Sequence, residues 1–268
     1  MEIENQSSGD EYLLNLFLTE EGIANPAIWY KRLRDESPVF ESSSGAIFLS
    51  RYSDCRTLFR DNRLGKDDRE GPGGSALPRD ESEEVKAYRK ELSENRGDSS
   101  PSMLFLNPPD HTRLRALVSR AFTPKRVDSM RASITSLTED CLDNLAENGG
   151  GDAMEILGFL PVNVIGELVG VPKSDWDYFR PLVTAGVASL EAAPSLDELK
   201  ASTAAFIEMN EYFTQLLAER KESPRDDLMS ALIEVEESGD RISEPEVVST
   251  IILLFAAGME TTQNLIGN

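Results

Sequence analysis

The stretch "SEPEVVSTIILLFAAGMETTQNLIGN", residues 243 to 268, decides the fold class. Ser243 and Glu246 stand three residues apart at its start, which is the pattern of a capping box. The run from Val247 to Ala257 is apolar on nearly every side, as expected for a helix that passes through a core. That run is too short to span a bilayer. We therefore expect a buried helix here, within a fold that is mainly α with a small β element.

Small and polar residues interrupt this helix near its end. Gly258 costs about 1 kcal/mol relative to alanine in a helix interior, and it lets a flat or bulky group approach the backbone. Thr261 can donate a hydrogen bond to the Ala257 carbonyl, which tends to bend a helix. Leu254, Ala257 and Thr261 share one face. Glu260, if buried, needs a partner or shifts toward its neutral form. This predicts an acid and a hydroxyl beside a void; the alternative is a tight helix crossing at the glycine.

Composition excludes several classes of function. Acidic residues number 48 and basic residues 27, for a net charge of −21, which disfavours binding to nucleic acid or to an anionic membrane. Two cysteines, Cys55 and Cys141, cannot build a disulfide framework, and one histidine, His111, excludes a His-rich metal site. The N-terminus is acidic and lacks the features of a secretory signal or membrane anchor. We expect a cytoplasmic protein.

Shorter signals outline the rest of the chain. Apolar alternation around a Ser/Gly turn in "PVFESSSGAIFLSRY" predicts a hairpin. Ser53 is the expected N-cap of the helix after it. Further along, Thr123 followed by proline predicts the start of a helix that reaches about Asn148. Residues 66–102 are polar and rich in Gly, Pro and Ser, which indicates a loop with one short helix inside it. Such a loop is either a functional cover or a surface excursion.

The segment "FLNPPDHTRLRALVSRAF", residues 105 to 122, adds a second clue. His111 and Arg115 stand four apart on one helical face, where two donors can bind a pair of carboxylates or one phosphate. For either residue alone, a local hydrogen bond or a surface ion pair is the ordinary explanation.

Together, "NPPDHTRLR" and "AAGMETT" resemble the cytochrome P-450 family of haem-thiolate monooxygenases. The first looks like the segment that opens the family's C helix, and the second matches its I-helix pattern Ala/Gly-Gly-x-Asp/Glu-Thr-Thr. "FLPVNVIGELVGVP" and "RYSDCRTLFRDNRL" look like its E-helix and B-helix regions. The resemblance, strongest to soluble bacterial members, implies a truncated cytochrome P-450 fold that covers the helix A to I region. Residues 1–268 would then form a single incomplete domain.

The resemblance also implies a cofactor, haem b, in the complete protein. His111 and Arg115 would hydrogen-bond the haem propionates. Ala257 and Gly258 would border the distal face of the haem.

Oxygen chemistry and substrate binding would use the same helix. Thr261 would hold dioxygen and its water network, and Glu260 would deliver protons. Leu254 and Ala257 would contact a small hydrophobic substrate, and the 66–102 loop region would cover it. The implied function is hydroxylation or epoxidation of that substrate with dioxygen and two electrons.

A local basic stretch suggests an electron donor. Six cations lie between residues 113 and 131, with Asp128 as the one acid among them: Arg113, Arg115, Arg120, Lys125, Arg126 and Arg131. If this helix lies on the proximal side of the haem, as in the family, its exposed cations would dock an acidic ferredoxin. A solvated basic face is the alternative.

One element of the family pattern is missing. The family's axial ligand is a cysteine thiolate in a Gly-containing loop beyond the I helix, whereas Cys55 and Cys141 stand in ordinary helical contexts. We therefore assign no metal ligand, and we expect the 268-residue chain alone to be inactive and poorly stable. The alternative function is a non-catalytic helical remnant, or pseudoenzyme, that binds a hydrophobic ligand or partner without haem.

Overall fold

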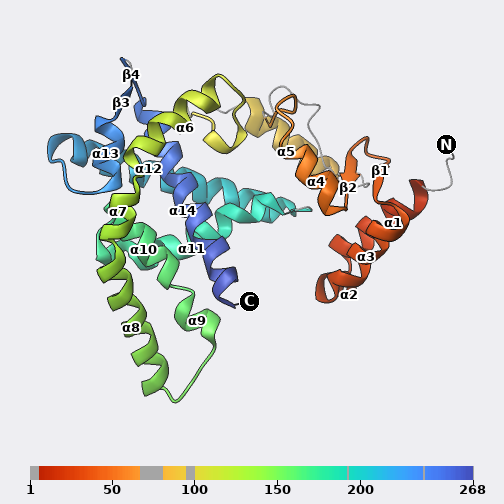
Figure 1. Ribbon diagram of the computed structural model, residues 1–268, viewed down its shortest axis with the longest axis horizontal. Helices are drawn as coiled ribbons and strands as arrows, with labels where there is room; N and C mark the ends of the chain where they lie inside the picture. Colours follow the sequence, from red (N-terminus) through yellow and green to blue (C-terminus); the bar gives the residue numbers. More distant parts are fainter. Residues whose placement is uncertain (1–5, 67–80, 95–99, 192, 238, 268) are drawn as a thin grey trace. The chain divides into compact units, whose positions relative to one another are not determined.

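The structure, a computed structural model, describes residues 6–66, 81–94, 100–191, 193–237 and 239–267. Helices make up most of it and two short hairpins supply the strands, so the predicted mainly α fold with a small β element is confirmed. Packing divides the chain into two compact units (Figure 1). Unit 1 is Met1–Asn95 with Leu190–Leu196, and unit 2 is Arg96–Ser189 with Asp197–Asn268.

Unit 1 combines helices with one hairpin. Its elements are α1 (Gln6–Leu18), α2 (Glu20–Ala24), α3 (Pro26–Glu36), β1 (Val39–Glu41), β2 (Ile47–Leu49), α4 (Tyr52–Leu58) and α5 (Glu83–Glu94). The two strands run antiparallel, with Val39 opposite Leu49, which confirms the predicted hairpin. A small core forms around Leu13 and Leu33. The predicted short helix in the 66–102 region is α5; residues 67–80 and 95–99 of that region lie outside the described residues, so its covering role stays a prediction.

Unit 2 holds the longer helices. Its α-helices are α6 (Asp110–Ala121), α7 (Pro124–Ser129), α8 (Arg131–Glu147), α9 (Ala153–Leu157), α10 (Leu160–Val169), α11 (Trp176–Val187), α12 (Leu196–Glu222, which begins at the unit boundary), α13 (Leu228–Glu234) and α14 (Glu244–Gly267). Its shorter elements are η2 (Met103–Phe105), η3 (Lys173–Asp175), η4 (Ala188–Leu190), β3 (Glu236–Glu237) and β4 (Asp240–Arg241). No helix in the described ranges is long and apolar enough to cross a membrane.

The core of unit 2 is built around α14, as the sequence predicted. The helix packs against α10, α11, α13 and α9, and it runs through the middle of this unit (Figure 1). Phe179, Phe213 and Phe255 come from α11, α12 and α14, are fully buried, and have ring centroids 5.0 to 5.2 Å apart. Aromatic contacts at this spacing add to the burial of apolar area, so they hold the three helices together.

Helix starts agree with the sequence in part. Thr123 accepts a hydrogen bond from the Arg126 amide, as a predicted N-cap should, but the helix expected to reach Asn148 is divided at Met130 into α7 and α8. The prediction that Ser53 is an N-cap is wrong, because α4 begins at Tyr52 with Arg51 in the N-cap position, and the Ser53 hydroxyl donates to its neighbour Asp54.

Only one of the two hydrogen bonds of the predicted capping box forms at the start of α14. The Glu246 carboxylate accepts a hydrogen bond from the Ser243 amide at 2.8 Å, as predicted. The Ser243 hydroxyl donates to the same carboxylate at 2.8 Å instead of accepting from the backbone. The glutamate side of the box therefore forms the cap.

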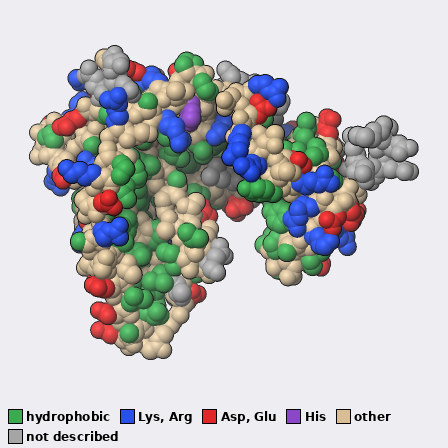
Figure 2. All heavy atoms as spheres, viewed as in Figure 1, with side chains coloured by type: hydrophobic (Ala, Val, Ile, Leu, Met, Phe, Trp, Pro, Cys, Tyr) green, Lys and Arg blue, Asp and Glu red, His purple; other side chains and the backbone are tan. Residues whose placement is uncertain are grey.

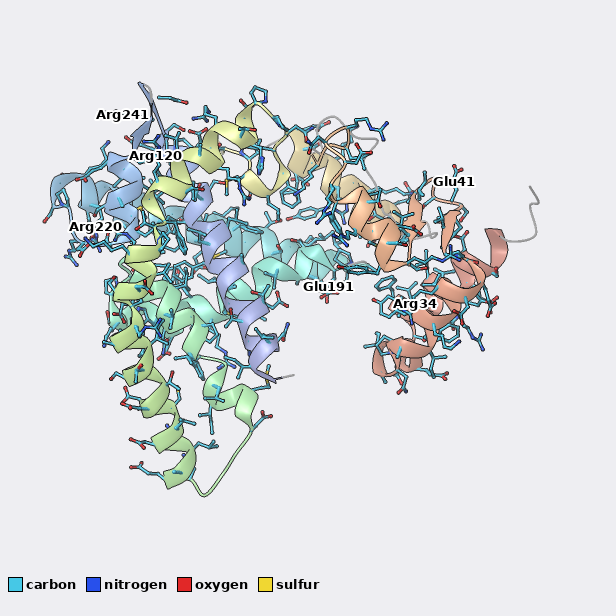
Figure 3. The ribbon with its side chains drawn as sticks, viewed as in Figure 1. Arg34, Glu41, Arg120, Glu191, Arg220 and Arg241 are labelled. Atoms are coloured by element: carbon cyan, nitrogen blue, oxygen red, sulfur yellow. The ribbon has the colours of Figure 1, made fainter. Side chains whose placement is uncertain are left out.

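A buried ion pair joins three helix ends in unit 2 (Figure 3). Arg220, near the end of α12, is 2% exposed; it donates from Nε to Asp227 Oδ2 at 2.6 Å and from its guanidinium to the Gly170 carbonyl at 2.6 Å. Asp227 also accepts from the Ser230 amide at 2.8 Å, and so it caps α13. Gly170 ends α10 in the left-handed region, with φ +97°. The side chains of Arg220 and Asp227 and the Gly170 carbonyl therefore satisfy one another within this cluster.

Candidate functional site

The second half of α14 has one buried side and one open side. Phe255 and Met259 are buried, whereas Ala257 and Thr261 are exposed and Leu254 is half-buried. Residues at three- and four-residue spacing share a face, so Leu254, Ala257 and Thr261 form one stripe along the open side. The structure thus exposes a hydroxyl on a helix whose other side is packed into the core.

The hydroxyl of Thr261 bonds back into the helix. Its Oγ1 donates to the Ala257 carbonyl at 2.5 Å, which confirms the predicted contact. The helix nevertheless runs without a break to Gly267, so this bond does not open the helix. A second donor to this carbonyl, besides the backbone amide of the helix, is tolerated because a carbonyl oxygen carries two lone pairs.

Gly258 is not required by helix packing. A Cβ built on this residue would lie 3.7 Å from the Cγ1 atom of Ile165 on α10, which is ordinary van der Waals contact. Alanine would therefore fit between the two helices. The tight helix crossing that could have explained the glycine is absent among the described neighbours.

Glu260 lies beside Thr261 in sequence but not on its face. Successive residues of a helix are turned by about 100° around its axis, so the two side chains leave in different directions. Glu260 is half-buried, and its carboxylate makes no hydrogen bond or ion pair within the described part of the chain. The structure therefore does not join the acid directly to the hydroxyl.

His111 and Arg115 lie on one face of α6, as predicted. Leu114, Leu117 and Val118 are buried, which directs His111 (half-buried) and Arg115 (exposed) away from the core. Neither of these two side chains has a hydrogen-bond or ion-pair partner among the described residues. They are donors that remain available to an anionic group.

Arg113, between them, has a different role. Its guanidinium makes a short hydrogen bond to Glu246 at the start of α14 and lies 3.5 Å from Asp240. It therefore links α6 to α14 across 133 residues of sequence. The sequence did not predict this pair; Glu246 was assigned only to the helix cap, and it serves both partners.

The basic stretch is not uniformly exposed. Lys and Arg side chains gather at the surface over α6 (Figure 2). Arg113 is 33% exposed and Arg126 22% exposed, and each is paired with an acid. The cations of the stretch with open side chains are Arg115, Arg120, Lys125 and Arg131.

The two cysteines belong to different units, Cys55 to unit 1 and Cys141 to unit 2. Cys55 Sγ, in α4, donates to the Leu49 carbonyl at 3.5 Å. Cys141, in α8, is half-buried, and burial followed by the nearby Asp140 charge raises the pKa of its thiol. A raised thiol pKa disfavours the thiolate, which is the form that binds metals. Within the described ranges, no three His, Cys, Asp or Glu side chains are grouped to hold a metal ion.

Comparison with known proteins gives the family. No family model matches the sequence. The chain is 34% identical over 252 residues to the polyketide biosynthesis cytochrome P450 PksS of Bacillus subtilis, covering 91% of this chain and 58% of that protein. It is 38% identical over 249 residues to the vitamin D(3) 25-hydroxylase of Pseudonocardia autotrophica, covering 91% of this chain and 56% of that protein.

Solved structures agree with the sequence comparison. The crystal structure of P450BioI in complex with an acyl carrier protein ligated to hexadec-9Z-enoic acid has a TM-score of 0.75 and 27% identity, covering 93% of this chain and 61% of that one. The chain thus spans somewhat more than half the length of the relatives that it matches. Because sequence and fold similarity each cover about nine-tenths of the chain, and both agree with the two motifs on α6 and α14, the chain belongs to the cytochrome P450 family.

Proposed function

We propose that the complete protein is a haem-dependent monooxygenase that hydroxylates or epoxidises a small hydrophobic molecule. The observation that carries this proposal is the open stripe on α14, where Thr261 and Ala257 are exposed on a helix otherwise packed into the core. Family membership supports it, because the stripe coincides with the family's I-helix pattern. The names of two relatives refer to polyketide biosynthesis and to vitamin D(3) hydroxylation, and we carry over only a hydrophobic class of substrate.

The residues on α6 fit a haem b cofactor. Haem propionates are carboxylates, and His111 and Arg115 are donors at a spacing that suits two such groups, with no competing partner in the described part of the chain. A bound haem would supply the redox chemistry of dioxygen, which side chains lack. Neither Cys55 nor Cys141 fits as an axial ligand, and we assign none.

On α14, the Glu260 carboxyl would supply protons and the Thr261 hydroxyl would receive and pass them on. Thr261 Oγ1 now donates to the Ala257 carbonyl, and its lone pairs can accept a hydrogen bond from a water. If the hydroxyl rotates outward, it can instead donate toward the open stripe. Glu260 has no partner in the described residues and leaves on another face, so a proton from its carboxyl would reach Thr261 Oγ1 through at least one bridging water.

Substrate binding would use the apolar part of the same stripe. Leu254 is half-buried and Ala257 is exposed one turn further on, so both can contact a hydrophobic molecule and exclude water from Thr261. We also propose that the exposed cations Lys125 and Arg131 help to dock a ferredoxin-type electron donor.

Measuring how well variants retain haem tests the roles proposed for His111 and Arg115. In the complete protein, His111→Ala combined with Arg115→Ala should weaken haem retention by about tenfold or more, because two charge-assisted hydrogen bonds are lost. Arg131→Ala, an exposed cation in the same stretch, is the matched control. Haem loss to an acceptor protein is the readout, and equal rates for the double variant and the control would remove the assigned role.

The oxygen chemistry needs a separate experiment. Thr261→Val keeps the shape of the side chain but removes the hydroxyl, so it should lower the amount of product formed per dioxygen consumed while haem retention stays unchanged. A complete protein that binds no haem, or a valine variant with an unchanged product yield, would contradict the proposed function.

A further inference from the structure

A pocket of about 450 Å³ lies in unit 2 at the end of the basic stretch. It is lined by residues from the end of α6, from α7 and its N-cap, and from α13 and its neighbours, and its charged members are Arg120, Lys125, Arg126, Asp226 and Glu234. Arg120 is contributed by the last turn of α6 (Figure 3). This volume is in the range of pockets that bind small molecules. The proposed monooxygenase site on α14 shares none of these residues.

Arg126 is the main reason to expect an anion here. Its side chain is 22% exposed, so much of the guanidinium's hydration has been removed. Its ion-pair partner Asp226 lies 3.4 Å away and is fully exposed, and ion pairs of this kind contribute little. The guanidinium is therefore partly desolvated and weakly compensated. An anion with several acceptor oxygens would compensate it better, because arginine binds such groups with two parallel hydrogen bonds.

The rest of the lining combines polar and apolar residues. Lys125 adds a second cation on α7, and Thr123 and Ser129 add hydroxyl-bearing side chains. Ala231 of α13 and Val235 just after it add apolar lining, with the acid Glu234 beside them. A bare inorganic anion has no apolar part to contact Ala231 and Val235, whereas a small organic group attached to it does.

We propose that this pocket binds a small organic phosphate. The overall charge of −21 disfavours general anion binding, so a site for an anion on this chain requires a local concentration of cations, which the pocket provides. The two acids at the pocket, Asp226 and Glu234, limit its affinity. Removal of Asp226 should therefore strengthen binding, which is a prediction that simple loss of folding cannot imitate.

The chain contains two ion pairs that allow a matched experiment. Arg126–Asp226 lies in the pocket, and Arg131–Asp128, 3.6 Å apart with side chains 82% and 73% exposed, lies outside it. Phenyl phosphate is the probe, inorganic phosphate is the comparison ligand, and isothermal titration calorimetry at constant ionic strength is the measurement. Arg126→Gln should weaken phenyl phosphate binding by about tenfold, whereas Arg131→Gln should leave it nearly unchanged.

The acidic partners should act in the opposite direction. Asp226→Asn should tighten binding by about threefold or more, and Asp128→Asn, which removes the same charge outside the pocket, should not. Phenyl phosphate should also bind more tightly than inorganic phosphate, because only the ester has an apolar group that can contact Ala231 and Val235. No binding by the wild-type chain, or equal effects at positions 126 and 131, would overturn the proposal. Binding of an acidic ferredoxin that depends on Arg126 and Lys125, with no binding of phenyl phosphate, would overturn the proposal and show that this surface is a protein-docking face.

Discussion

The buried pair Arg220–Asp227 should be the most sensitive point of unit 2. Arg220→Met keeps much of the side-chain volume but removes the charge, and it leaves the Asp227 carboxylate, 6% exposed, without its cation. The Gly170 carbonyl loses its 2.6 Å hydrogen bond at the same time. Breaking a buried pair on one side typically costs 3–5 kcal/mol, and we expect about 4 kcal/mol here.

The double variant separates lost packing from the stranded charge. Asp227→Asn alone leaves the buried Arg220 with only the exposed Glu219, 3.8 Å away, as an anion, and should cost about 3 kcal/mol, although asparagine can still cap α13. Arg220→Met combined with Asp227→Asn strands no charge, so it should cost less than the Arg220 change alone. The cost of the double variant would then be at least about 3 kcal/mol smaller than the sum of the two single costs.

These free energies of unfolding are measured by urea denaturation, monitored by circular dichroism. The dependence of the free energy on urea concentration should be the same in all variants, which excludes a changed unfolded state. Arg131→Met, which alters an 82% exposed side chain, is the control and should change stability by less than about 0.5 kcal/mol. A cost below about 1 kcal/mol for Arg220→Met, or additive costs in the double variant, would refute the reasoning.

Three further changes test other parts of unit 2. Gly170→Ala should cost about 3 kcal/mol in the same urea assay, because φ is +97° and the new Cβ would lie 2.1 Å from Asp227 Oδ2. Thr250→Val should raise the free energy of unfolding by about 1 kcal/mol, because the threonine is 1% exposed and its hydroxyl has no partner in the described part of the chain. A decrease of similar size would show that the hydroxyl does have a hydrogen-bond partner. The hydrogen bond to Glu208, followed by burial, raises the pKa of Tyr178 from 10.0 to about 12. The stabilisation from this raised pKa is complete below pH 10 and is lost as the pH rises toward 12. Tyr178→Phe should therefore make the free energy of unfolding fall less steeply between pH 10 and 12 than it does in the wild-type chain. The same fall in both proteins would contradict the assignment.

The candidate site was predicted correctly where it depends on contacts within a few residues. The Thr261 back-bond, the half-formed cap at Ser243 and the shared face of His111 and Arg115 all follow from the fixed spacing of helix geometry. The same geometry could have shown that Glu260 and Thr261 leave the helix on different faces. The roles assigned to these residues in binding haem or moving protons stay predictions.

The two motifs and their order also determined the family, because they survive in a linear sequence and the comparisons agree with them. Apolar runs and helix-start signals were enough to expect a mainly helical chain, and the single histidine was enough to expect no His-rich metal site. Neither property depends on which helices touch each other.

Only the tertiary structure decided which charges are paired and which are open. Arg113 meets Glu246 across 133 residues, and Arg220 meets the Gly170 carbonyl across 50. In the sequence, Arg113 and Arg126 look the same as Arg131; in the fold, the first two are largely covered and the third is open. The physical reason is that the environment of a charge is set by the elements packed around it. Those elements come from distant parts of the chain, which no local pattern records.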